Sequence, residues 1–126
     1  MGAEDILFTR ARIRPRAVLK TMAIRKAFLM TLKPGQQDEY EKRHQSIWPE
    51  LEQVLSEHGV SNYSIFLNRA TDQLFAYVEI DSEEAWQQTA ETEACRRWWF
   101  YMKDLMLTTA DNKPAMIALD QVFHLD

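Results

Sequence analysis

Two neighbouring stretches of alternating apolar and polar residues constrain the fold of this chain more than any other feature. They cover residues 62–68 and 73–80. The apolar side chains at every second position are Tyr63, Ile65 and Leu67 in the first stretch and Leu74, Ala76, Val78 and Ile80 in the second. A period of two is typical of a strand that buries one face. Because only residues 69–72 separate the stretches, the pattern predicts a β-hairpin with one face on a core.

The segment before the hairpin predicts an interrupted helix. Residues 36–58 repeat apolar side chains at spacings of three and four, as an amphipathic helix does. Pro49 must interrupt this helix, because proline lacks an N–H donor and disfavours a helical residue before it. We expect a first helix to about Ser46, a kink near Trp48, and a second helix that starts at Pro49 and stops at Gly59.

The segment after the hairpin predicts a second helical region. Asp81 and Glu84 have the spacing of a capping box, so we expect a helix to begin there. Thr92 is placed to restart it. Residues 94–107 have a strongly helical composition, and we expect helix throughout that range.

Two further strands complete the predicted order of elements. Residues 24–32 and 116–125 are short and apolar, as buried strands are. The order strand, helix, strand, strand, helix, strand predicts an α+β fold, a ferredoxin-like βαββαβ arrangement with a four-stranded antiparallel sheet. Both helical regions would cover one face of the sheet. Aromatic residues in the strands would give both faces apolar surface: Phe28, Tyr63, Phe66, Phe75 and Tyr77. A second copy of the chain is the simplest candidate to bury the uncovered face.

Composition excludes several classes of function. The single cysteine, Cys95, cannot form an internal disulfide, which agrees with a reducing, cytoplasmic compartment. No apolar run approaches the roughly 20 residues that span a bilayer. The net charge of −4 argues against a nucleic-acid partner. Only three glycines occur and no metal-ligand spacing is present, so we expect neither a nucleotide cofactor nor a metal.

The first 21 residues differ from the remainder of the chain. They are basic on balance and carry alternating arginines at Arg10, Arg12 and Arg14. They contain no apolar run of the length that a secretory signal needs. We interpret residues 1–21 as a non-essential N-terminal extension and residues 22–126 as a single domain.

Tyr40 and His44 form the first candidate constellation. Positions i and i+4 of a helix share a face, about 6 Å apart along its axis. Histidine has an ordinary pKa of about 6.5, so His44 can give and take a proton at neutral pH. Packing of this pair on the inward face, beside Ile47 and Leu51, is the structural alternative.

Consecutive aromatic residues at 98–101 form the second constellation. Neighbouring residues on a helix point about 100° apart, so Trp98 and Trp99 cannot occupy the same face. Flat aromatic rings line small-ligand pockets, but tryptophan is also enriched in protein interfaces. Tyr63 could add a phenolic hydroxyl to the same pocket, or serve as an ordinary strand residue. Trp48 is interpreted as a structural wedge at the helix kink.

Several of these segments resemble one known family. They are IRKAF at 24–28, EYEKRH at 39–44, IWPEL at 47–51, NY at 62–63, VEI at 78–80 and CRRWW at 95–99. Together they closely resemble the L-rhamnose mutarotase family, and the likeness runs from Met22 to the C-terminus. The resemblance implies a homodimeric protein of the dimeric α+β barrel type.

The resemblance also implies roles for the candidate residues. His44 takes the place of a proton-donating catalytic histidine. Tyr40 and Tyr63 match sugar-contacting tyrosines, and Trp98 and Trp99 match a tryptophan pair that contacts the sugar. No cofactor is implied.

The implied activity is an isomerisation at the anomeric carbon of L-rhamnose. His44 would protonate the ring oxygen as a general acid, while a tyrosine or a water molecule accepts the anomeric proton. Ring opening and closure then interconvert the α and β anomers. Two alternatives have the same fold class: a cofactor-free monooxygenase, and a non-catalytic dimer that binds a small metabolite.

Overall fold

The computed structural model describes residues 23–126. The predicted extension, residues 1–21, and its boundary at residue 22 lie outside the described part of the chain. Among the described residues, no helix is long and apolar enough to cross a membrane.

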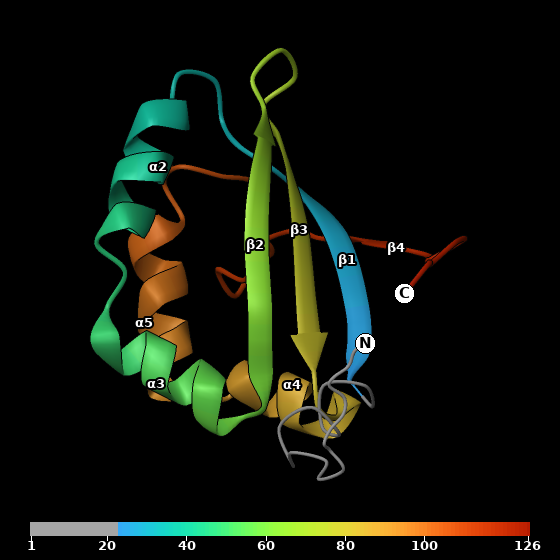
Figure 1. Cartoon of the computed structure of the whole chain (residues 1–126). Helices are drawn as coiled ribbons and strands as arrows, with labels where there is room; N and C mark the ends of the chain where they lie inside the picture. The colour runs from blue at the N-terminus through green and yellow to red at the C-terminus, as the bar shows by residue number, and fades with distance from the viewer. Residues whose placement is uncertain (1–22) are drawn as a thin grey trace, which may run out of the picture.

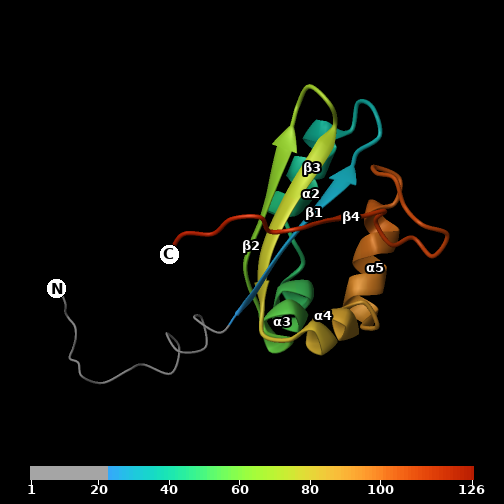
Figure 2. The same cartoon turned by 90° about the vertical axis from the view of Figure 1, so that its right-hand side faces the viewer.

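The described elements follow the predicted order, with each helical region divided in two (Figure 1). They are β1 (Ile24–Thr31), α2 (Gln37–Gln45), α3 (Pro49–Glu57), β2 (Val60–Asn68), β3 (Gln73–Ile80), α4 (Glu83–Thr89), α5 (Glu93–Met102) and β4 (Ile117–Leu119). The four strands pair in the order β2-β3-β1-β4, and every pairing is antiparallel. The helices cover one face of this sheet (Figures 1 and 2). The ferredoxin-like prediction is confirmed.

The predicted hairpin forms one side of the sheet, with β2 at the edge and β3 next to it. Asn68 pairs with Gln73 at the turn end, and the ladder continues with Leu67 opposite Leu74. The four alternating apolar residues of β3 expose at most 1% of their surface: Leu74, Ala76, Val78 and Ile80. Because a period of two puts them all on one face, these side chains of β3 form part of the core between the sheet and the helices.

The break between α2 and α3 has the predicted physical cause. Trp48 has an extended backbone (φ −68°, ψ 130°), and Pro49 begins α3. Gly59 ends this helical region with φ +78°, a conformation that only glycine adopts without strain. The chain therefore changes direction twice, and α3 reaches the same end of the sheet as the start of β2.

Capping of the second helical region differs from prediction at one position. Ser82, and not Asp81, is the N-cap of α4, and its Oγ accepts a hydrogen bond from the Ala85 N–H at 3.1 Å. Asp81 instead donates its backbone N–H to the Gly59 carbonyl. The predicted restart at Thr92 is confirmed, since its side chain accepts from the Cys95 N–H at the start of α5.

The prediction of helix through residue 107 is wrong, because α5 ends at Met102. Leu105 and Met106 beyond it are buried beside the end of β1, whereas Leu107 is exposed. Lys33 N–H donates to the Leu105 carbonyl and Leu107 N–H donates to the Thr31 carbonyl, both at 2.9 Å. Amino-acid composition alone does not distinguish a continued helix from non-helical chain packed beside β1.

The predicted strand at 116–125 is mostly wrong as well. Only β4, Ile117–Leu119, pairs with β1. The last residues project away from the sheet, on the side opposite the helices (Figure 2). Val122, Phe123 and Leu125 are 78–94% exposed.

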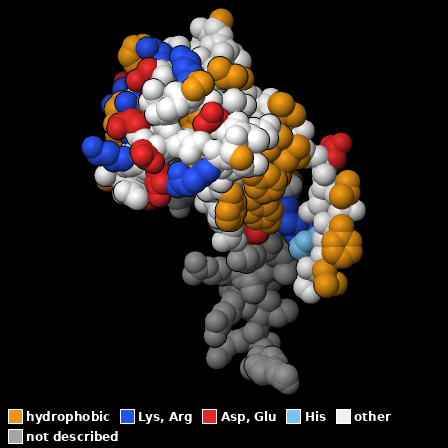
Figure 3. Space-filling view, turned by 90° about the horizontal axis from the view of Figure 1, so that it is seen from above, with side chains coloured by type: hydrophobic (Ala, Val, Ile, Leu, Met, Phe, Trp, Pro, Cys, Tyr) orange, Lys and Arg blue, Asp and Glu red, His pale blue; other side chains and the backbone are white. Residues whose placement is uncertain are grey.

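The sheet face opposite the helices carries exposed apolar side chains. Phe66 and Phe75 lie opposite each other on β2 and β3, with ring centroids 6.5 Å apart, and both are exposed. Ile117 and Leu119 of β4 are also exposed. Hydrophobic side chains gather on the body of the molecule and again along the C-terminal arm beside it (Figure 3). This face has the apolar character that the sequence predicts.

Candidate functional site

A cavity of about 980 Å³ lies between the helices and the covered face of the sheet. Its walls come from α2, α3, β2, α4, α5 and the segment before β4. All five residues singled out in the sequence line this cavity: Tyr40, His44, Tyr63, Trp98 and Trp99. The fold therefore brings together side chains from two helices and one strand.

One turn of α2 positions Tyr40 and His44. Their rings are stacked with a tilt of 32° between the ring planes, and their centroids are 4.3 Å apart. Nδ1 of His44 is 3.1 Å from the carbonyl oxygen of Tyr40. Because a carbonyl oxygen only accepts hydrogen bonds, Nδ1 must carry a proton here. A neutral His44 is then left with an unprotonated Nε2, which can accept a proton.

Trp98 contacts the imidazole as well. Its ring stands perpendicular to that of His44, with centroids 5.3 Å apart. Trp98 is 7% exposed and belongs to the core, whereas Trp99 is half-buried and packs at the edge of the core. Both rings still reach the cavity. Their separation on α5 thus gives the cavity two different aromatic walls.

Tyr63 enters from the edge strand. A β-bulge between Ser61 and Ser64 includes Asn62, which has φ 47°. The Tyr63 ring packs edge-on against Phe28 and Trp86, at centroid distances of 6.5 and 6.1 Å. This irregularity in β2 therefore determines how Tyr63 enters the cavity wall.

Trp86 is a cavity residue that the sequence reasoning missed. It lies on α4, is half-buried, and lines the cavity beside Tyr63. An aromatic side chain in the first turn of a capped helix was the available signal. Nothing in the sequence linked that turn to β2, because the contact depends on how α4 packs across the sheet.

Burial controls the protonation of the polar side chains. It lowers the pKa of His44, and the hydrogen bond to the Tyr40 carbonyl only partly offsets this. It raises the pKa of Tyr40 and of Tyr63 above the ordinary value for tyrosine. Burial also raises the pKa of Cys95 to about 12. At neutral pH the imidazole is therefore mostly uncharged, the phenols keep their protons, and Cys95 is not a thiolate nucleophile.

Charged residues occupy the rim of the cavity. Glu41 and Arg69 form an ion pair of 3.1 Å, and Lys113 lies near the mouth. Within residues 23–126, no group of three or more histidine, cysteine, aspartate or glutamate side chains is arranged to hold a metal ion. The chemistry available to this cavity is proton transfer and hydrogen bonding beside aromatic walls.

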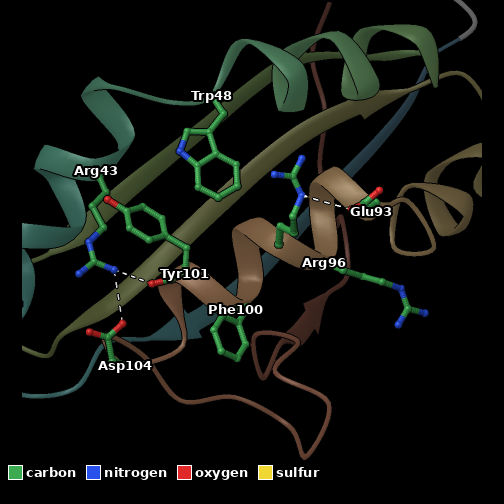
Figure 4. Close-up of a pocket in the computed structure, with 8 residues that line it drawn as sticks. Arg43, Trp48, Glu93, Arg96, Phe100, Tyr101 and Asp104 are labelled. Atoms are coloured by element: carbon green, nitrogen blue, oxygen red, sulfur yellow. Dashed lines mark hydrogen bonds and ion pairs between the residues drawn. The ribbon is translucent and has the colours of Figure 1, made fainter.

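A second, shallower groove of about 630 Å³ lies on the outer side of α5 (Figure 4). Trp48 and Tyr101 form its aromatic floor, with ring centroids 5.3 Å apart. Arginines line the groove, but each is ion-paired, as with Arg43 to Asp104 and Arg97 to Glu50. Since these cations are neutralised and no candidate acid or base from the sequence faces them, the inner cavity is the candidate active site.

Known proteins share this sequence and fold. The family model for L-rhamnose mutarotase matches residues 25–125. The L-rhamnose mutarotase of Tolumonas auensis is 57% identical over 102 residues, which are 81% of this chain and 98% of that protein. The protein of the same name from Lachnoclostridium phytofermentans is 52% identical over 103 residues, covering 82% of this chain and 99% of its own length.

Among solved structures, the L-rhamnose mutarotase of Formosa agariphila has a TM-score of 0.75 at 40% identity. It covers 82% of this chain and 99% of its own. The segments that carry the resemblance in the sequence lie within the matched region. This chain belongs to the L-rhamnose mutarotase family.

Proposed function

We propose that this protein is an L-rhamnose mutarotase, an isomerase that interconverts the α and β anomers of the sugar. One observation carries the proposal at the level of chemistry. In a chain of this family, the His44 imidazole is hydrogen-bonded through Nδ1 and reaches a cavity lined by tyrosine and tryptophan rings. Family membership disfavours the monooxygenase and the passive binding module.

Mutarotation needs two proton transfers at neighbouring oxygens. Ring opening breaks the bond between C1 and the ring oxygen O5. The anomeric hydroxyl O1 loses a proton and O5 gains one. The carbonyl at C1 is then attacked from its other face, and the reverse transfers close the ring. General acid–base catalysis of such transfers is worth about 10²–10⁴-fold.

His44 is proposed as the residue that donates the proton to O5. Because burial lowers its pKa, the imidazole enters the reaction mostly neutral and must first acquire that proton. The anomeric hydroxyl is the nearest source, since O1 and O5 are bonded to the same carbon. Nε2 would take the proton from O1 and deliver it to O5, while the bond from Nδ1 to the Tyr40 carbonyl stabilises the cationic ring.

The remaining candidates are proposed to bind the sugar. Tyr40 and Tyr63 keep their phenolic protons because burial raises their pKa, so they suit hydrogen bonding to hydroxyl groups better than proton abstraction. Trp98 and Trp99 offer flat apolar surfaces to the C–H faces of a pyranose. No metal, nucleotide or redox cofactor takes part in this scheme.

The protein is further proposed to be a cytoplasmic homodimer whose working domain is residues 22–126. The exposed apolar sheet face and the exposed C-terminal arm support a second copy as the partner. A dimeric ferredoxin-like protein from an uncultured marine organism has a related fold, with a TM-score of 0.55 at 16% identity. The single buried cysteine agrees with a reducing compartment.

The test of this function is exchange NMR on the anomeric protons of L-rhamnose. We expect the protein to accelerate α/β exchange above the spontaneous rate without changing the equilibrium ratio. Saturable sugar binding without faster exchange would identify a passive binding module. Oxygen consumption with a small aromatic substrate, and no effect on any 6-deoxyhexose, would favour the monooxygenase.

A further inference from the structure

Trp48 lies at the boundary between the inner cavity and the outer groove. It immediately precedes Pro49 and is the N-cap of α3, with an extended backbone that turns its indole toward α5. The ring lies beside Tyr101 in the groove, as Figure 4 shows. Its centroid is 5.3 Å from that of Tyr101, with only 30° between the ring planes. One side of the indole is therefore covered by a second aromatic ring.

An ion pair holds this part of α3 against α5. Arg97 Nη2 donates to Glu50 Oε2 at 2.6 Å, and the same guanidinium lies 5.8 Å from the centre of the Trp48 ring. Arg43 fixes Tyr101 in turn, because it donates to the Tyr101 carbonyl at 2.6 Å and stacks over its ring. These contacts leave the indole little freedom to rotate.

Trp48 also contacts the aromatic wall of the cavity. Trp48 and Trp98 are perpendicular, with centroids 5.1 Å apart. Trp98 is perpendicular to His44 on its other side. Tyr101 also contacts Trp98 directly, with ring centroids 5.7 Å apart, so Tyr101, Trp48 and Trp98 form one cluster of rings that continues to His44. Because packed interiors have few voids, a change in Trp48 has to be absorbed by the rings it contacts, Trp98 among them.

We propose that Trp48 is a positioning residue that holds Trp98 against the His44 imidazole from outside the cavity. The proposal rests on the proposed function, since it assigns Trp48 to the same proton-transfer site. This positioning role goes beyond the earlier interpretation of Trp48 as a structural wedge at the helix kink. If Trp98 is released, the imidazole loses one of the two rings that enclose it and becomes accessible to water.

The decisive variant is Trp48→Leu, with Trp48→Phe as the conservative replacement. For Trp48→Leu we expect kcat for anomer exchange to fall roughly tenfold or more, because a small misplacement of a catalytic group can cost up to about 10²-fold. KM should change less than kcat. An NMR titration of the histidine side chain should show the pKa of His44 rising toward its ordinary value of about 6.5. Trp48→Phe should restore both quantities most of the way.

Phe100→Leu is the matched control. Phe100 lines the same groove and is 61% exposed, with Lys103 over its ring. Its replacement should leave both kcat and the titration of His44 unchanged. Wild-type values for Trp48→Leu would overturn the proposal, as would an equal effect from Phe100→Leu.

A second pair of variants covers the case in which Trp48→Leu does not fold. Arg97→Gln and Glu50→Gln release the ion pair without removing the ring. Both should lower kcat and raise the pKa of His44, by less than the loss of the indole would. Wild-type values in both would overturn the proposal. Absence of rhamnose exchange in the unmodified protein would instead contradict the proposed function, while the titration still tests the positioning role.

Discussion

The imidazole of His44 is enclosed by Tyr40 on one side and Trp98 on another, with Nδ1 bonded to a backbone carbonyl. His44→Asn removes the proton-transfer group while keeping a polar side chain of similar reach. We expect anomer exchange to fall about 10²–10⁴-fold, the usual contribution of a general acid–base group. The free energy of unfolding should change by less than about 1 kcal/mol, because His44 is only half-buried. Exchange NMR and urea denaturation measure the two effects.

His58→Asn is a matched control for that change. His58 resembles His44 in its backbone contact: its Nδ1 lies 2.7 Å from the carbonyl oxygen of Val54, four residues earlier in α3. It does not line the cavity. Its replacement should leave the exchange rate unaltered. A wild-type rate in His44→Asn would assign the proton transfer to another group.

The pH dependence of the rate follows from the direction of the His44 shift. Burial lowers the pKa of His44, so the neutral form prevails at pH 7 and is lost as pH falls through the lowered value. If neutral Nε2 takes the anomeric proton, kcat should be constant above neutrality and should decline only as the pH falls through this lowered pKa, which lies below the ordinary histidine value. Rates corrected for spontaneous exchange at each pH will show this. A rate that rises toward acid would mean that the imidazolium enters the reaction.

At the scale of residues, the sequence indicates which side chains line the cavity better than it indicates how they are arranged there. The i, i+4 spacing was sufficient to place Tyr40 beside His44. Their meeting with Tyr63 and Trp98 depends on how β2 and α5 pack, which no local pattern encodes. Trp86 was missed for the same reason. The roles of these residues await the measurements above.

At the scale of elements, Gly59 controls the turn from α3 into β2. A Cβ at this position would lie 2.6 Å from Asp81 Oδ2, and φ is +78°. Gly35 is a natural control, with φ +80° and nothing within 4 Å of its Cβ position. Gly35→Ala should cost about 1–2 kcal/mol from the left-handed backbone alone. Gly59→Ala should cost more, because Asp81 is tied to Gly59 through its backbone N–H.

Urea denaturation of the two glycine variants measures this difference directly. A larger loss in Gly59→Ala is the expected outcome. Equal losses would show that the Asp81 side chain moves aside, and that backbone conformation alone accounts for both effects.

Elements with strong local causes were predictable, and elements defined by tertiary pairing were not. Pro49 and Gly59 set the ends of α3 through their own backbone restrictions. The end of α5 at Met102 has no such marker, since Leu105 and Met106 are buried equally well beside β1. The short length of β4 also depends on tertiary pairing, which the local sequence does not show. The apolar residues after Leu119 have strand-like composition, but within residues 23–126 the chain offers them no pairing strand.

At the scale of the whole molecule, the sheet has two faces of different character. The helices α2 to α5 bury one face and line the cavity. The other face exposes the ring pair of Phe66 and Phe75 and the apolar side chains of β4. Exposed contiguous apolar surface of this kind marks an interaction site. A two-fold related copy would present the same patch and bury both at once.

The dimer prediction is tested by placing a charge on this face. Phe75 is 41% exposed and lies outside the cavity wall, so Phe75→Lys should disturb association without altering the site. We expect sedimentation equilibrium to show a dimer for the unmodified protein and a monomer for the variant, because each interface would bury two unpaired ammonium groups.

Phe100→Lys is the matched control for this experiment, since Phe100 is 61% exposed on the outer side of α5. It should remain dimeric. A monomeric unmodified protein would contradict the proposed assembly. A dimeric Phe75→Lys variant would show that the interface does not include this face of the sheet. If Phe75→Lys is monomeric and folded, its exchange rate reports on the site itself. A retained rate would mean that one subunit holds the complete catalytic apparatus, and a lost rate would mean that the partner copy closes the cavity.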